Sequence, residues 1–270
     1  MTDHYSKQEG KRELKAPIPK YPTDKIKQSE LEEKTIPSSY TKEDGFLDPS
    51  LFVIVSGGEV REKDYFDFFQ RKYKELNRPI FPKLRIKFIA ENSEGQGGLD
   101  VTDLVDAAID VKKHLDESKD VDLIDSINLV TDVDEFYDQI IERYSDCQEN
   151  HLNLVISNPC FELWLYYSYF AEKPDYIVPE DVSKISGGFK TYLGEKKAGG
   201  VDPRKAPFEI AKAINNSKGN FSKDANDIPN LFSTNMHELA EKLDELIFFD
   251  LEIYKKKMAA EREKFMNKKS

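Results

Sequence analysis

The chain has 270 residues, of which 39% are hydrophobic and 34% charged, with a formal net charge of −11. This length predicts one large α/β domain with appendages or two small domains. The negative charge argues against a uniformly basic coat for nucleic acid, although a local basic groove or a bound metal would still allow such binding. Two cysteines, Cys147 and Cys160, are too few for a disulfide framework or a four-cysteine zinc site.

No apolar stretch approaches the length of about 18 residues that a membrane span requires, so no membrane segment is expected. The first residues, Met1 to Ser6, lack the apolar region of a secretory signal, and a cytoplasmic protein is expected. Residues 1–48 are rich in Lys, Glu, Pro and Ser and predict a flexible, charged N-terminal arm.

Strand-like and helix-like runs alternate over residues 49–170. Strands are expected at 51–55, 84–89, 126–131 and 151–156, and helices at 62–76, 100–115, 135–144 and 160–170. Short β-branched runs bounded by turn residues are typical of buried parallel strands. Their alternation with helices predicts βαβ units, and hence an α/β fold whose parallel or mixed sheet carries helices on both faces.

The pattern changes after residue 170. Proline and glycine residues, including Gly187–Gly188 and Gly199–Gly200, predict loops around short helices over residues 171–250. Helices are expected at 208–214 and 236–249, as a helical extension of the same domain. Residues 251–270 are charged and rich in lysine, and they predict a C-terminal tail that ends as a frayed helix.

Two acidic turns follow apolar strand-like runs. Leu51–Val55 leads into Ser56–Glu62, and Ser126–Thr131 leads into Asp132-Val133-Asp134. Ligands of open α/β sheets bind beyond the carboxyl ends of the strands, so these acids are expected to converge there. Clustered carboxylates repel one another unless a cation lies between them, and Mg²⁺ prefers oxygen ligands. The other interpretation of the Asp pair is a solvated turn or a helix N-cap.

The remaining acidic candidates also have two interpretations each. Gly57–Gly58 can present backbone N–H groups to an anion, or can simply form a tight turn. Glu59 and Glu62 can bind a metal, or can stabilise the first turn of a helix. Glu162 lies among apolar residues, so it is either a buried, paired carboxylate facing the site or a carboxylate that favours a helix N-terminus.

A loose basic stretch lies beyond these acids, interrupted by Phe189 and Tyr192. Its cations are Lys184, Lys190, Lys196, Lys197, Arg204 and Lys205. Such a stretch suits a surface that contacts phosphates, and a solvated lysine-rich surface is the alternative.

Several blocks in this order resemble the RloB-like family, whose core is similar to a Toprim domain. They are Phe52–Glu59 with Glu62, Asp132–Asp134, Asn158–Trp164 and, more weakly, Ser233–Leu239. The resemblance covers about residues 51–246. It implies a role in bacterial antiphage defence by abortive infection, often beside a gene for an ABC- or AAA-type ATPase. By analogy with Toprim enzymes, it also implies a metal-dependent nuclease.

One position departs from that resemblance. The first block of the family usually reads Cys-Glu-Gly-Glu, whereas here it reads Ser56-Gly57-Gly58-Glu59. The glutamate usually assigned as general acid/base therefore falls on Gly57, which cannot transfer a proton. Glu59 or Glu62 is the candidate replacement, and loss of catalysis is the alternative.

The leading hypothesis is a Toprim-like phosphodiesterase that uses Mg²⁺ or Mn²⁺ to cleave DNA or RNA. Asp132, Asp134 and Glu59 would hold the metal, and Glu59 or Glu62 would act as base. Glu162 would be a further ligand or would orient one. The nucleic-acid backbone would contact Lys190, Lys196, Lys197, Arg204 and Lys205. The alternative is a catalytically silent regulator that docks on a defence ATPase. Either protein could form a homo-oligomer.

Overall fold

The computed structural model describes residues 49–91, 95, 97–117 and 124–267. The N-terminal arm expected over residues 1–48 lies outside the described residues. So do part of the loop expected at 94–98 and the last three residues of the expected tail.

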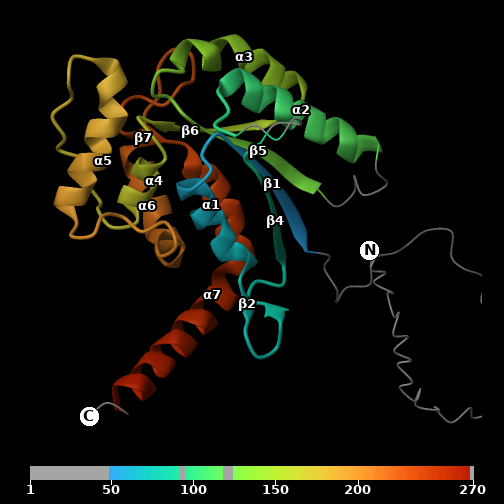
Figure 1. Cartoon of the computed structure of the whole chain (residues 1–270), viewed down its shortest axis with the longest axis vertical. Coiled ribbons are helices and arrows are strands. Elements are labelled where there is room, and N and C mark those ends of the chain that lie inside the picture. The colour runs from blue at the N-terminus through green and yellow to red at the C-terminus, as the bar shows by residue number, and fades with distance from the viewer. Residues whose placement is uncertain (1–48, 92–94, 96, 118–123, 268–270) are drawn as a thin grey trace, which may run out of the picture. The chain divides into compact units, whose positions relative to one another are not determined.

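A five-stranded sheet forms the centre of the described domain (Figure 1). Its strands, in spatial order, are β4 (Leu84–Ile89), β1 (Ser50–Ser56), β5 (Ile124–Asp132), β6 (Asn153–Asn158) and β7 (Ser233–Thr234). The first four strands are parallel, and β7 is antiparallel to β6. The expected parallel or mixed sheet is therefore confirmed, and the arrangement is consistent with a Toprim-like α/β fold.

Strand register brings three strand ends together. Val55 of β1 lies opposite Leu129 of β5, and Thr131 of β5 lies opposite Ile156 of β6. Because these strands run in the same direction, the segments that follow them leave the sheet at one edge. The acidic turns expected from the sequence therefore begin side by side.

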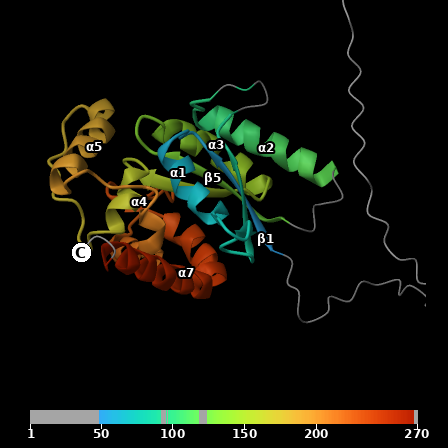
Figure 2. The same ribbon diagram turned by 60° about the horizontal axis from the view of Figure 1, so that its bottom comes forward.

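Helices cover both faces of the sheet, as expected. Figure 2 shows α2 (Val101–Glu117) and α3 (Tyr137–Glu149) on one side of the sheet and α7 (Met236–Asn267) on the other. Alternate strand residues point to opposite faces. Val53 and Leu129 therefore pack under α2 and α3. Ile54 and Val130 belong to the second core, with the helices α1 (Arg61–Phe66), α4 (Glu162–Tyr167), α6 (Ile210–Asn220) and α7.

The helix expected at 62–76 is shorter in the structure. α1 ends at Phe66 and continues as the 3₁₀ helix η1 (Asp67–Gln70), followed by the hairpin of β2 (Lys72–Tyr73) and β3 (Arg78–Pro79). Phe68 and Phe69 are both buried. The rings of both residues pack against Phe81, with ring centroids 5.5 and 6.2 Å apart, so η1 is anchored to the core.

The glycine pair expected in a loop lies within a helix. Gly187–Gly188 belongs to α5 (Ile185–Lys196), which follows the 3₁₀ helix η3 (Val182–Lys184). Phe189 and Leu193 of α5 are buried. Their spacing of four residues places both on one face, and this packing outweighs the low helix propensity of glycine.

The last helices also differ from the expected bounds. The helix expected at 208–214 is the 3₁₀ helix η4 (Ala206–Glu209) followed by α6, and α7 continues 18 residues beyond the expected end, as far as Asn267. The distal half of α7 extends away from the rest of the domain (Figure 1). Over the described residues, none of the helices combines the length and the apolar character needed to cross a bilayer.

Candidate active site

The carboxyl end of β5 and the segments that follow β1 and β6 border a cavity of about 360 Å³. The glycine turn after β1, the end of β5 and the start of α4 all contribute to its wall. Its charged lining side chains, within the described part of the chain, are Glu59, Arg61, Glu62, Asp132, Glu162 and Lys190. The cavity therefore combines buried carboxylates with two cations.

Glu62 folds back over the turn that precedes its helix. A Cβ atom at Gly58 would lie only 2.0 Å from Glu62 Oε2, so glycine at 58 makes room for this carboxylate. Glu62 is 9% exposed. Burial raises the pKa of Glu62, and the nearby Glu162 carboxylate raises it further, against the lowering effect of its own backbone N–H. A carboxyl with a raised pKa suits proton transfer near neutral pH.

Asp132, the last residue of β5, lines the cavity and interacts electrostatically with both Glu62 and Glu162. Its Oδ1 atom is buried and has no hydrogen-bond partner in the part of the chain that the structure describes. Burial raises the pKa of Asp132 well above its ordinary range, and Glu62 and then Glu162 raise it further. Buried polar atoms are normally paired, so this oxygen marks a position where a ligand would be stabilised.

Glu162 is the carboxylate that has cationic partners. Its side chain is 7% exposed, and its two oxygens lie 3.7 Å from Arg61 Nε and 3.8 Å from Lys190 Nζ. Both interpretations of Glu162 from the sequence therefore apply. It is a buried carboxylate paired with cations, and it is also the first residue of α4. Burial, and then the Glu162 carboxylate, raise the pKa of the Cys160 thiol well above its usual range, which disfavours a nucleophilic thiolate.

Two of the expected acidic residues do not lie inside the cavity: Asp134 is outside its lining, and Glu59 is at its exposed rim. Asp134 is not among the described residues that line the cavity, and its backbone N–H donates to the carbonyl of Pro159. The strand ends at Asp132, so the alternation that would place both carboxylates on one side does not extend to residue 134. Glu59 is exposed at the rim, and a Cβ atom at Gly97 would lie 1.6 Å from its Oε1 atom. Glu59 therefore packs against the loop around Gly97.

Gly57 occupies the position where the resemblance described above leads us to expect glutamate. A Cβ atom there would lie 2.7 Å from the backbone carbonyl oxygen of Leu99. The φ angle of Gly57 is not positive, so the backbone conformation itself would allow a side chain. The obstacle is the backbone carbonyl oxygen of Leu99, which approaches this position closely. Glu62, whose carboxylate covers the neighbouring Gly58, is the acidic group next to this turn.

The donor set suits a hydrated hard cation. Considering only the described residues, no three His, Cys, Asp or Glu side chains lie close enough together to hold a metal ion jointly. Mg²⁺ often uses only one or two carboxylates and keeps several waters. Asp132, with its unpartnered oxygen, and one of Glu62 or Glu162 fit this requirement, so the residues present are compatible with such an ion.

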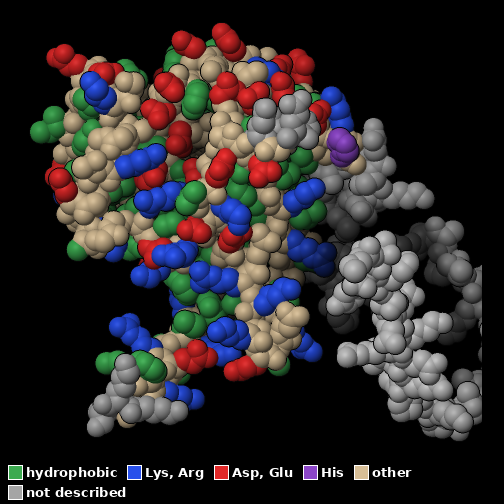
Figure 3. Space-filling model, viewed as in Figure 1, with side chains coloured by type: hydrophobic (Ala, Val, Ile, Leu, Met, Phe, Trp, Pro, Cys, Tyr) green, Lys and Arg blue, Asp and Glu red, His purple; other side chains and the backbone are tan. Residues whose placement is uncertain are grey.

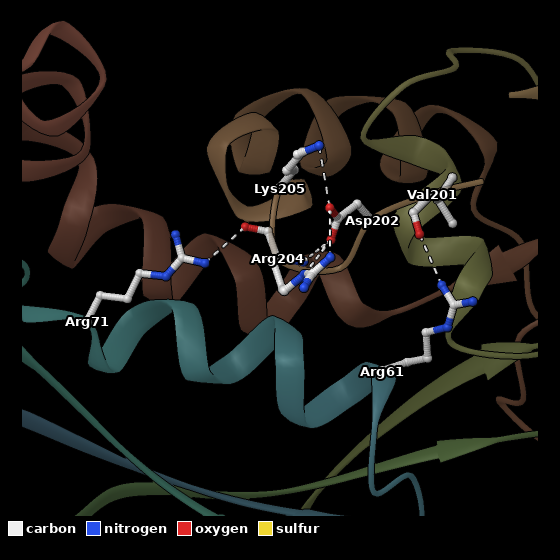
Figure 4. Close-up of polar contacts among 6 residues, drawn as sticks. All are labelled: Arg61, Arg71, Val201, Asp202, Arg204 and Lys205. Atoms are coloured by element: carbon white, nitrogen blue, oxygen red, sulfur yellow. Dashed lines mark hydrogen bonds and ion pairs between the residues drawn. The ribbon is translucent and has the colours of Figure 1, made fainter. Parts of the chain in front are cut away.

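A row of cations extends from the cavity along α1 and η1. Arg61 and Arg71 reach from the two ends of this segment to the 201–205 loop (Figure 4). Arg61 donates to the carbonyl of Val201 at 3.0 Å, and Arg71 donates to the carbonyl of Arg204 at 3.4 Å. The side chains of Arg204 and Lys205 pair with the same acid, Asp202. This row, defined as Arg61, Arg71, Arg204 and Lys205, therefore carries excess positive charge.

The surface around this row contrasts with the acidic composition of the chain. In Figure 3, Asp and Glu side chains gather over α2 and α3, whereas Lys and Arg side chains predominate over α1 and the elements below it. Of the expected phosphate contacts, Lys190 lies at the cavity, and Arg204 and Lys205 belong to the row. Lys196 pairs with Asp175 at 3.1 Å, and Lys197 lies over the Tyr169 ring.

Sequence reasoning missed Arg61 and Arg71. Arg61 lies within the acidic block Gly58–Glu62, and Arg71 lies within the segment that was expected to be a single helix. Their partners are backbone carbonyls about 130–140 positions away in the chain. The only local signal was two arginines ten residues apart, flanking an aromatic run.

The family profile described as RloB-like protein matches residues 52–243 of this chain. No curated protein gives a significant match to it. No solved structure does so either. The matched region contains most of β1, the whole cavity and the first turns of α7. Since the profile covers well over half of the sequence, the chain belongs to the RloB-like protein family.

Proposed function

We propose that this protein is a Mg²⁺- or Mn²⁺-dependent phosphodiesterase that cleaves nucleic acid in bacterial antiphage defence. One observation carries the catalytic part: Glu62, Asp132 and Glu162 line one cavity beyond neighbouring strands, and the buried Oδ1 atom of Asp132 has no protein partner there among the described residues. Membership of the RloB-like family supports the defence role. The row of cations beside the cavity supports a phosphate-containing substrate.

The cavity residues divide the chemistry among them. When bound, a divalent cation would supply Lewis-acid activation of the phosphate and of a water. Asp132 would bind this cation through its unpartnered oxygen. Glu62 would accept the proton of the attacking water, since its raised pKa brings it closer to neutrality and its carboxylate faces the cavity. Glu162 holds Arg61 and Lys190 where they would stabilise negative charge on the phosphate.

The row of cations would position the substrate. Arg61, Arg71, Arg204 and Lys205 lie along one segment, and contacts of this kind bind the nucleic-acid backbone without reading its sequence. Binding should then weaken as salt concentration rises, because each neutralised phosphate releases counterions.

The test is cleavage of labelled single- and double-stranded DNA and RNA by the wild-type chain with Mg²⁺, with Mn²⁺ and with chelator. Wild type should cleave at least one substrate only with metal. Asp132→Asn and Glu62→Gln should each lower the rate by about 100-fold or more, on the order of the loss of one catalytic acid/base group. Asp134→Asn is the matched control, since this neighbouring aspartate lies outside the cavity lining, and it should retain the rate. A wild type that is inert on the whole panel, or an active Asp132→Asn, would contradict the proposal.

A second candidate is a catalytically silent regulator of a defence ATPase. Two observations favour it: Gly57 replaces the catalytic glutamate of the family, and Glu162 already has two cationic partners. It predicts an inert wild type together with direct, reversible binding to the ATPase encoded beside its own gene. Metal-dependent cleavage that requires Asp132 would exclude this candidate.

A further inference from the structure

The cavity contains cations of its own. Lys190 and Arg61 contact opposite oxygens of Glu162, at 3.8 and 3.7 Å. Both cations are about half exposed, at 48% and 47%, whereas Glu162 is 7% exposed. The carboxylate is therefore fixed inside the wall, and the two cations reach it from the solvent side.

Lys190 interacts electrostatically with Asp132 and Glu62 as well as with Glu162, its ion-pair partner. Glu162, Asp132 and Glu62 all raise the pKa of Lys190 against the lowering effect of burial, so its ammonium group lies in the field of all three carboxylates. It extends from α5, next to Phe189, whose buried ring anchors this helix to the core. The lysine side chain is long and flexible, so the ammonium group can move into solvent while α5 remains in place.

Formal charges show what this arrangement favours. When all three are ionised, Glu62, Asp132 and Glu162 carry three negative charges, and Arg61 and Lys190 carry two positive ones, which leaves one net negative charge. A divalent cation alone would convert this into one net positive charge. A phosphodiester alone would bring its negative charge toward three carboxylates. The two together would leave the cavity neutral, and interactions at these distances are only partly screened by solvent.

We infer that Lys190, assisted by Arg61, makes metal binding and phosphodiester binding cooperative. Without substrate, the ammonium group of Lys190 supplies the positive charge that the carboxylates need and weakens the binding of a divalent cation. When a phosphodiester enters, its oxygens attract both cations away from Glu162, and the carboxylates bind the metal more tightly. This inference rests on the proposed function.

Cooperativity of this kind is reciprocal. If a phosphodiester increases the affinity for metal by some factor, the metal must increase the affinity for the phosphodiester by the same factor. A protein built this way binds a divalent cation more weakly when its cavity is empty than when a nucleic-acid strand lies in it. Its metal site is then completed by the substrate.

The inference is tested by titrating the full-length protein with Mn²⁺ in a calorimeter, with and without dimethyl phosphate as the phosphodiester probe. In wild type, the probe should lower the Kd for Mn²⁺ by about fivefold or more, the usual range of such coupling. Lys190→Met should bind Mn²⁺ about fivefold or more tightly without the probe and should respond less to it. Lys190→Arg, which keeps the charge, should behave like wild type.

A matched control lies on the same helix. Lys196 belongs to α5 but pairs with Asp175 away from the cavity, so Lys196→Met should titrate like wild type. An unchanged or weaker Mn²⁺ affinity in Lys190→Met would overturn the inference while leaving the proposed function intact, provided that Asp132→Asn abolishes Mn²⁺ binding. If neither wild type nor Lys190→Met binds Mn²⁺ with or without the probe, both the inference and the proposed function fail.

Discussion

Replacing Asp132 by asparagine is expected to make the metal-free protein more stable. The substitution keeps the shape of the side chain and removes its charge. In wild type, this charge faces Glu62 and Glu162, and one of its oxygens is buried without a partner among the described residues. Folding without metal therefore brings together carboxylates that repel one another, and the asparagine variant avoids this cost.

The magnitude can be worked out from the groups involved. A buried polar group without a partner costs about 1–3 kcal/mol, and more when it is charged. Asparagine keeps a polar atom in this position but removes the charge, so the gain is the cost of burying the charge beside two other carboxylates. We expect the free energy of unfolding to rise by about 1–3 kcal/mol. At roughly 2–4 °C per kcal/mol for a domain of this size, the Tm should increase by about 2–12 °C.

The gain should depend on pH in a defined direction. The folded-state pKa of Asp132 is raised above its unfolded value, so wild type has its full stability below the unfolded pKa. Wild type loses stability as pH rises through the raised folded pKa, and the asparagine variant does not. The two proteins should therefore unfold alike in acid and differ most at neutral and basic pH.

The assay is thermal unfolding of wild type, Asp132→Asn and the control Asp134→Asn in chelator over a range of pH. Mg²⁺ should raise the Tm of wild type and of Asp134→Asn but not that of Asp132→Asn, because only the first two keep the proposed ligand. A lower Tm for Asp132→Asn than for wild type in chelator at neutral pH would show that the charge of Asp132 does not destabilise the metal-free fold. So would a difference between the two that grows as the pH falls.

Three further predictions concern other contacts. Since burial raises the pKa of Glu62, the rate of cleavage should fall with decreasing pH at a midpoint above the ordinary value for a glutamate, and Glu62→Gln should abolish activity at every pH tested. Gly58→Ala should keep its Tm but lose most activity, because the new methyl group displaces the flexible Glu62 carboxylate rather than the backbone; an active variant would contradict this. Asn235 accepts from the N–H of Ile156 at 2.6 Å and donates to the carbonyl of Leu154 at 2.9 Å. Asn235→Ala should therefore lower the free energy of unfolding by about 1–3 kcal/mol for each group left unpaired, as measured by urea unfolding.

The sequence was sufficient for the sheet and for part of the cavity. Short β-branched runs separated by helices indicate parallel strands, and the turns after neighbouring parallel strands lie at one edge of the sheet. The position of these turns at one edge is enough to predict that Glu62, Asp132 and Glu162 lie around one site. The alternation of side chains between the two faces holds only within a strand. It could therefore not place Asp134, which lies two residues beyond the end of β5 at Asp132.

The cationic part of the site depends on tertiary contacts that no local pattern encodes. Arg61 and Arg71 are oriented by carbonyls of the 201–205 loop. Lys190 reaches the cavity because Phe189 and Leu193 hold α5 against the core, although its glycines suggested a loop. The expected bounds of the 62–76 helix failed as well, because the residues after Phe66 form η1 and the β2–β3 hairpin, whose strand pairing no helical period signals.

The contact between Gly57 and the Leu99 carbonyl has an evolutionary consequence. With 2.7 Å between that oxygen and any Cβ atom at 57, a single substitution that introduces glutamate would force the backbone around residue 99 to shift. Two segments more than 40 positions apart have thus become mutually dependent, and change at 57 must wait for prior change in the segment around residue 99. A side chain at 57 and the present position of the Leu99 carbonyl therefore exclude each other, so that the two positions can change only together.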